Sequence, residues 1–251
     1  FQPPLNFIAM SEIRLSKLMA DRGLCSRREA DKLIQKGLVR VDNNVISKLG
    51  TKVDPNADIS LAPEAIRARE RLVTLIVNKP PGYVSTQPEK GYLDVRSLII
   101  PPNQYVSSHQ SENDFVRSKS LHTAGRLDID SSGLVVLTQD GTIVRRLIHP
   151  THPVSKEYIV TVKGVITESA IEKLREGLVL DGRRLRQAEV FRTKVDQLKI
   201  VLRQGRNRQI RRMCELVELE VRSLVRMRIG NLCLADLPRG KWRFMTRDES
   251  F

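Results

Sequence analysis

The chain has 251 residues, with 43 lysines and arginines against 29 aspartates and glutamates, a formal net charge of +14 and an isoelectric point of about 10.1. So large a positive excess is unusual for an enzyme of small neutral metabolites. It indicates a polyanionic partner, either nucleic acid or an anionic membrane surface. Hydrophobic residues make up 40% of the sequence, enough for a packed core, which excludes a wholly disordered basic tail.

Residues 1–11 form an extension without the basic start and long apolar run of a secretory signal. No aliphatic run in the sequence approaches the roughly 18 apolar residues of a membrane-spanning helix. The three cysteines, Cys25, Cys214 and Cys233, lie far apart and form no C-x-x-C pair. We therefore expect reduced, buried thiols, no metal site and a cytoplasmic location.

Residues 12–61 have the pattern of a small compact unit. Apolar residues at helical spacing predict a short first helix that ends at Gly23. Ser26 and Glu29 form a capping box at the start of a second helix. Short strands are expected at 38–41, 45–46 and 59–61.

The second helix of this unit carries basic residues at positions i, i+4 and i+8, namely Arg28, Lys32 and Lys36. Residues at this spacing share one helix face. The face is either a solvated surface or a phosphate-binding one. Because no regular acidic partners are interleaved, we favour phosphate contact.

Residues 62–71 are charged and lack a strand pattern, which is typical of a linker. From residue 72 to residue 251, strand patterns alternate with isolated helices, which predicts an α+β fold and not a regular βαβ array. The polar stretch 101–120 is expected to be an exposed loop. Strands are expected at 72–77, 134–137, 158–162, 190–193, 198–202 and 221–229, and helices at 142–148, 167–176 and 207–217.

The densest cluster of chemically active residues is Gly125–Leu134. Its aspartates imitate the start of a calcium-binding loop, but the twelfth position is Gln139, where such a loop needs a bidentate glutamate. Two interpretations remain: an ordinary turn whose polar side chains satisfy local backbone groups, or a catalytic carboxylate, Asp128, kept ionised by a nearby arginine. For Asp130 we expect a capping or structural role.

A second motif spans Gln204–Met213. Asn207 is the expected N-cap of its helix, and Ile210 and Met213 are expected to face the core. Cations are mildly unfavourable at a helix N-terminus, so a cluster of arginines there indicates that they meet an anion.

Taken in order, these motifs resemble the RsuA/RluF group of pseudouridine synthases, with Lys79–Thr86, Lys156–Tyr158 and Leu237–Arg243 matching further segments of the group. Residues 12–61 resemble the alpha-L RNA-binding module of ribosomal protein S-four. The resemblance implies a mixed, mainly antiparallel β-sheet catalytic domain with flanking helices. It also implies a monomer that isomerises uridine in RNA without a cofactor. The implied substrate is large-subunit ribosomal RNA, with a tRNA anticodon loop as a second one.

The resemblance also implies roles for individual residues. Asp128 is the catalytic carboxylate, Arg211 its ion-pair partner, and Tyr158 the platform for the extruded base. Arg126 fills the space that the flipped uridine leaves. Attack on the base, attack on the sugar and a glycal route all remain open for Asp128. The other expected substrate contacts are Arg206, Arg208, Lys79, Arg28, Lys32 and Ile229, the last being equally compatible with a plain core position.

Other interpretations stay open at this point. A non-catalytic RNA-binding protein would need only the positive charge, and a hydrolase could use Asp128 and Asp130 together. His149 and His152 resemble a metal pair, but the flanking prolines favour a rigid loop. His122, just before the first motif, is a candidate RNA contact.

Overall fold

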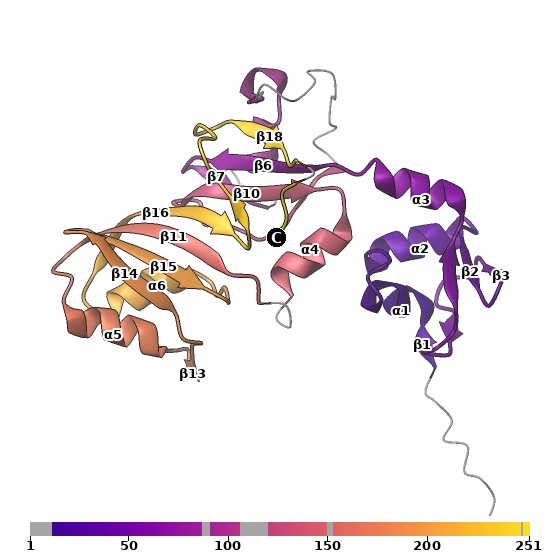
Figure 1. Cartoon of the computed structure of the whole chain (residues 1–251), viewed down its shortest axis with the longest axis horizontal. Coiled ribbons are helices and arrows are strands. Elements are labelled where there is room, and N and C mark those ends of the chain that lie inside the picture. Colours follow the sequence, from indigo (N-terminus) through magenta and orange to yellow (C-terminus); the bar gives the residue numbers. More distant parts are fainter. Residues whose placement is uncertain (1–11, 87–90, 106–119, 150–152, 247) are drawn as a thin grey trace, which may run out of the picture. The chain divides into compact units, whose positions relative to one another are not determined.

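A computed structural model describes residues 12–86, 91–105, 120–149, 153–246 and 248–251. Contacts divide the chain into two compact units (Figure 1). Unit 1 extends to Leu72 and includes Asp140–Thr142, and unit 2 comprises Val73–Gln139 and Ile143–Phe251. The extension 1–11, most of the loop expected at 101–120, and His152 lie outside the described residues.

Unit 1 packs two helices, α1 (Leu15–Asp21) and α2 (Arg27–Gln35), into one core with short strands. The predicted capping box is present: Ser26 Oγ accepts from the Glu29 amide at 3.3 Å, and the Glu29 carboxylate accepts from the Ser26 amide at 3.4 Å. The central strand β2 (Val39–Val41) pairs with β3 (Asn44–Ile46) and β5 (Ile59–Leu61), and β1 (Ile13–Arg14) pairs with β4 (Lys52–Val53). The segment expected as a linker contains a helix, α3 (Pro63–Glu70), whose proline suits the first turn.

Unit 2 is built on a sheet with nine strands in the described residues, in the order β14-β15-β11-β16-β10-β6-β18, with β17 beside β16 and β9 beside β10. Within the described part of this sheet only the short ladder between β10 and β16 is parallel. The α+β, mainly antiparallel fold is therefore confirmed. The strands are β6 (Thr74–Lys79), β9 (His122–Thr123), β10 (Ser132–Thr138), β11 (Lys156–Lys163), β14 (Glu189–Lys194), β15 (Gln197–Leu202), β16 (Glu220–Ile229), β17 (Leu232–Cys233) and β18 (Trp242–Phe244).

Both faces of this sheet are covered where β10 crosses it. Val135 and Leu137 join a core with α5 (Glu168–Glu176) and α6 (Gln209–Glu215), whereas Leu134 and Val136 join a second core that includes residues of α4 (Gly141–Ile148). Because a strand that is covered on both faces buries every side chain, its sequence is a continuous run of apolar residues. The uninterrupted Leu134–Leu137 pattern is thereby explained.

Smaller elements surround the sheet. Two 3-10 turns are η1 (Val95–Leu98) and η2 (Pro101–Asn103). A parallel pair joins β7 (Tyr83–Val84) to β8 (Leu93–Asp94), and a hairpin joins β12 (Val179–Leu180) to β13 (Arg183–Arg184). No helix within the described ranges has the length and apolar character that a bilayer span requires.

The start of α6 differs from the prediction. The helix begins at Gln209, and its N-cap is Arg208, in the left-handed region at φ 46° and without a side-chain cap, so Asn207 is not the cap. The side-chain oxygen of Gln209 instead accepts a hydrogen bond from the Arg206 amide at 3.0 Å. This contact fixes the turn that precedes the helix; it does not cap an amide of the first helical turn, as an N-cap asparagine side chain would. As expected, Ile210 and Met213 are buried in the core.

Candidate active site

The candidate carboxylates lie on a loop between β9 and β10 that neighbouring segments hold in place. The buried hydroxyl of Ser85 donates to the Leu127 carbonyl at 2.8 Å and accepts from the Leu127 amide at 3.0 Å. The Ser131 amide donates to the Asp128 carbonyl at 3.1 Å, which closes a turn. Such a loop fixes its side chains more firmly than a free surface turn would.

A buried arginine on β16 holds the two ends of the same loop. Arg226, only 1% exposed, donates to the carbonyls of Leu134 at 2.7 Å, Arg126 at 3.2 Å and Gly125 at 3.2 Å. Close to it, Gly133 has φ +103°, and a Cβ there would overlap the Arg226 backbone. Only glycine suits this position, because both its conformation and its space exclude a side chain.

A cavity of about 1010 Å³ opens beside the loop and is lined by residues of unit 2. Most of the side chains expected to act in catalysis or substrate binding in this unit meet there. The expected lining residues that the structure brings together are Asp128, Tyr158, Arg211, Arg126, Arg206 and Arg208. Lys156, Arg186, Arg203 and Arg226 also line it, so its wall is strongly basic.

The ion pairs beside the cavity correct one prediction. Arg211 Nη2 lies 3.2 Å from a carboxylate oxygen of Asp130, not of Asp128, and Arg208 Nη2 lies 3.0 Å from the other oxygen of Asp130. Within the described residues, Asp128 has no cation within 4.0 Å. The turn explains this, because residues two apart present their carboxylates differently: Asp130 to α6 and Asp128 to the cavity.

Asp130 is therefore the electrostatic partner of α6. Partial burial raises the pKa of its carboxyl, but the hydrogen bond from Arg208 and the charges of Arg211 and Arg208 outweigh burial and hold that pKa below its ordinary value. Arg211 also donates to the Asp130 carbonyl at 3.2 Å and to Ser131 Oγ at 3.4 Å. The structural role expected for Asp130 agrees with these contacts.

Tyr158 reaches the cavity from β11, with 8% of its surface exposed. It pairs in register with Arg226 of β16, and Lys156 lies two residues before it on the same strand. Burial lowers the pKa of Lys156 to about 8, and the positive charge of Arg226 adds to the effect. Within the cavity, Lys156 is thus a cation that can lose its charge near neutral pH.

Two expected substrate contacts lie elsewhere. Lys79 is fully buried, and its ammonium donates to the carbonyls of Pro80 at 3.0 Å, Tyr83 at 2.9 Å and Ile129 at 3.5 Å. Burial lowers its pKa to about 8. It supports the loop from behind and has no surface to offer RNA. Ile229 is fully buried with Leu232 and Leu234 and does not line the cavity, so the core alternative holds for it.

Arg28 and Lys32 are exposed on α2 of unit 1, and Lys36 is exposed at the C-cap of this helix, one position beyond its last residue. His149 lines the large cavity, and His122 is exposed on β9. In the residues that the structure covers, no group of three or more histidines, cysteines, aspartates or glutamates is placed to hold a metal ion. Cys25 and Cys214 are buried free thiols, but Cys233 is exposed, contrary to expectation.

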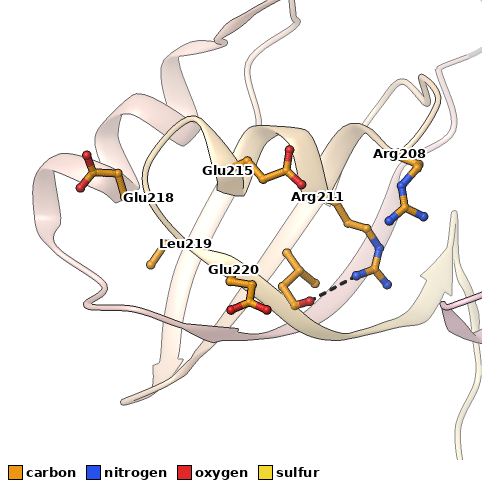
Figure 2. A pocket seen from close by; sticks show the side chains of 7 residues that line it. Arg208, Arg211, Glu215, Glu218, Leu219 and Glu220 are labelled. Carbon is orange, nitrogen blue, oxygen red and sulfur yellow. Dashed lines mark hydrogen bonds between the residues drawn. The ribbon is translucent and has the colours of Figure 1, made fainter.

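A smaller cavity of about 360 Å³ also includes Arg208 and Arg211 (Figure 2). Arg211 Nη1 donates there to the Val221 carbonyl at 3.3 Å. Its remaining charged lining residues are all acidic: Glu215, Glu218 and Glu220. The three carboxylates of the smaller cavity would repel the phosphates of a nucleic acid. The larger cavity, with its arginine-rich wall, suits such a polyanion better.

Sequence reasoning missed Arg226 and Lys156 as parts of this site. The signal for Arg226 was an arginine inside the predicted strand 221–229, within its alternating part Val225–Ile229. A cation on the inward face of a strand must find several acceptors, and here it finds three carbonyls. Lys156 lay within a quoted motif, but nothing in the sequence indicated its burial.

Comparison with known proteins agrees with this geometry. Residues 73–216 match the RNA pseudouridylate synthase family, and residues 13–59 match the S4 domain. The chain belongs to the RNA pseudouridylate synthase family, and the resemblance to its RsuA/RluF group is confirmed.

The chain is 38% identical over 242 residues to the dual-specificity RNA pseudouridine synthase RluF of Escherichia coli (strain K12), covering 95% of this chain and 77% of the relative. It is 36% identical to an uncharacterized RNA pseudouridine synthase of Mycobacterium leprae, covering 94% and 90%. A crystal structure of a pseudouridylate synthase aligns with a TM-score of 0.65 at 25% identity, over 94% of this chain and 96% of the other.

Proposed function

We propose that this protein converts uridine to pseudouridine at specific sites in large-subunit ribosomal RNA, with a tRNA anticodon loop as a second substrate. The observation that carries the proposal is that Asp128 and Tyr158 line one cavity with an arginine-rich wall. Family membership supports the reaction, and a relative described as dual-specificity supports more than one RNA class.

The reaction breaks the C–N glycosidic bond, turns the uracil and forms a C–C bond to the same sugar. No electrons or groups pass to a co-reactant, so we propose that no cofactor or metal takes part. Asp128 supplies the carboxylate beside the sugar and base. Tyr158 stacks on the extruded uracil, and Arg126 occupies the vacated place in the RNA.

Arg211 and Arg208 act together with Asp130 in this proposal. Asp130 holds both guanidinium groups at the cavity wall through contacts of 3.2 and 3.0 Å. Both guanidinium groups line the same cavity as Asp128, where they supply a positive field for the phosphates of the RNA. Arg206 adds to this field from the same segment.

The two units divide the work. We propose that residues 12–61 dock RNA, that residues 72–251 carry out catalysis, and that residues 62–71 connect them. We propose that the protein works as a monomer in the cytoplasm, a reducing compartment in which an exposed thiol such as that of Cys233 stays free.

Removing the basic face of α2 is expected to weaken RNA binding without slowing the chemical step. The triple variant Arg28→Ala, Lys32→Ala, Lys36→Ala loses up to three phosphate contacts, so the slope of log K against log salt should fall by about 2. The matched control changes Arg40, Lys48 and Lys52, which are exposed elsewhere in unit 1. Binding titrations at several salt concentrations measure the slopes, and equal slopes for the two variants would contradict docking by this face.

The lowered pKa of Lys156 predicts a pH effect on substrate binding. Its ammonium is charged below about pH 8 and loses its charge as the pH rises through that value. The wild-type KM for RNA should therefore rise between pH 7 and pH 9, by roughly threefold or more, whereas Lys156→Arg stays charged throughout. Steady-state kinetics of both proteins at each pH check this, since other titrations affect both alike. Parallel profiles would count against a role of the Lys156 charge.

The proposed function is tested by mapping pseudouridines in ribosomal RNA and tRNA from cells with and without the protein. Loss of specific pseudouridines, restored by the wild-type gene, is the expected result. Unchanged maps together with altered ribosome assembly would indicate a non-catalytic RNA-binding protein. Free uracil among the products of purified protein and RNA would indicate a hydrolase.

A further inference from the structure

A short arginine-rich hairpin follows α5 and lies next to the cavity segment in unit 2. Its strands β12 and β13 are joined by Asp181-Gly182, with φ of 53° and 70°. Positive φ at both central residues defines the type I′ turn, which matches the twist of the two strands. The hairpin, labelled at β13 in Figure 1, is therefore a defined structure and not an open loop.

Two arginines fix this hairpin to the segment that carries the cavity arginines. Arg212 of α6 makes a bidentate pair with Asp181, with contacts of 2.9 and 2.6 Å. Arg206 donates to the Leu180 carbonyl at 3.2 Å, and Leu180 itself is buried in the core. Bidentate arginine–carboxylate pairs fix orientation as well as distance. The hairpin therefore keeps a set position relative to Arg208 and Arg211.

The free positive charge of the hairpin segment faces solvent. Arg183, Arg184 and Arg186 are exposed, and no carboxylate within the described ranges pairs with any of them. Arg184 makes only a long bond of 3.4 Å to the Glu176 carbonyl, and Arg186 lines the large cavity. Arg212 pairs with Asp181, the acid in the turn of the hairpin, and Arg186 belongs both to the hairpin segment and to the cavity wall.

We propose that this hairpin is a phosphate clamp for the RNA strand that leaves the cavity, with Arg183 and Arg184 binding phosphates near the target nucleotide. The proposal rests on the proposed function. The segment 179–186 contains no aromatic residue, so it offers guanidinium donors for backbone phosphates and no stacking platform for bases. The Asp181–Arg212 pair acts as a positioning contact that sets the distance between clamp and cavity.

The first test compares the double variant Arg183→Ala, Arg184→Ala with the control Lys163→Ala, Lys194→Ala, at the ends of β11 and β14. The control removes two exposed positive charges from strand ends that line neither cavity. On an RNA that the wild-type protein modifies, the hairpin variant should show a KM about tenfold higher, kcat within about twofold, and a salt slope lower by about 1.4. The control should stay within about twofold of wild type in both constants.

The second test asks whether the position of the hairpin or only the total charge of the protein determines RNA binding. Asp181→Asn breaks the positioning contact but raises the net charge by one. If only total charge mattered, this variant would bind RNA as tightly as wild type or more tightly. A fixed clamp predicts weaker binding, with KM raised about threefold or more. Circular dichroism of each variant verifies the fold.

Two outcomes would overturn the clamp: equal kinetics for the hairpin and control variants, or unchanged or tighter binding by Asp181→Asn. A wild-type protein that modifies no RNA would instead contradict the proposed function.

Discussion

Replacing Asp128 by asparagine is expected to lower kcat by about 10⁴-fold, because the amide keeps the shape of the side chain and loses the anion on which the reaction depends. RNA binding should be nearly unchanged. Asp128 forms no ion pair in the described structure, so its loss leaves no buried cation without a partner. Tritium release from RNA labelled at uridine C5 measures the rate, and filter binding measures the affinity.

Two further variants test whether the loss of activity is specific to Asp128. Asp196→Asn, in the exposed turn between β14 and β15, is the matched control and should retain full activity. Asp130→Asn weakens the hold on Arg208 and Arg211 but leaves Asp128 in place, so reduced yet measurable activity is expected. If Asp128→Asn released tritium at the wild-type rate, or Asp130→Asn were the inactive variant, the assignment of the catalytic carboxylate would be wrong.

Replacing Arg226 by methionine is expected to destabilise unit 2 by about 3 kcal/mol or more, because three carbonyls in a buried site lose their donor. The loop that carries Asp128 loses its attachment to β16 at the same time. Activity should therefore fall even under conditions in which the protein remains folded. Neither effect depends on direct contact between Arg226 and RNA.

Urea unfolding monitored through Trp242 is the appropriate measurement, since this residue is the single tryptophan of the chain and is buried in unit 2. Arg226→Lys serves as the comparison. Its single ammonium cannot reproduce the geometry of the guanidinium, so it should recover only part of the lost stability. An unchanged unfolding midpoint for Arg226→Met would show that the three hydrogen bonds contribute nothing to the stability of this unit.

Local patterns predicted those parts of the fold that local physics determines. The capping box at Ser26 and Glu29 formed because both contacts lie within one helical turn. The buried run at 134–137 and the antiparallel pair β14–β15 followed from apolar periodicity. The order of the motifs identified the catalytic unit, because each motif carries residue types that few other structures need at that spacing.

The errors concern where individual side chains point. Asp128 and Asp130 are two residues apart in one turn, and only the folded loop decides which of them meets Arg211. A lysine after a strand normally reaches solvent, but the chain folds back over Lys79 and offers it three carbonyls. Ile229 was equally compatible with the cavity and with the core, and packing buries it in the core. Asn207 was the expected N-cap, but the helix begins one residue later, after Arg208.

The single parallel ladder of the described sheet joins two antiparallel halves, β14-β15-β11-β16 and β10-β6-β18, through two residue pairs. Tyr158 belongs to the first half, while the Asp128 loop leads into the second. The separation between carboxylate and aromatic ring is thus a property of this seam, where Gly133 lets the two backbones touch. A side chain at residue 133 would push the backbones of β10 and β16 apart, and it would thereby move the Asp128 loop away from Tyr158 although it touches neither residue.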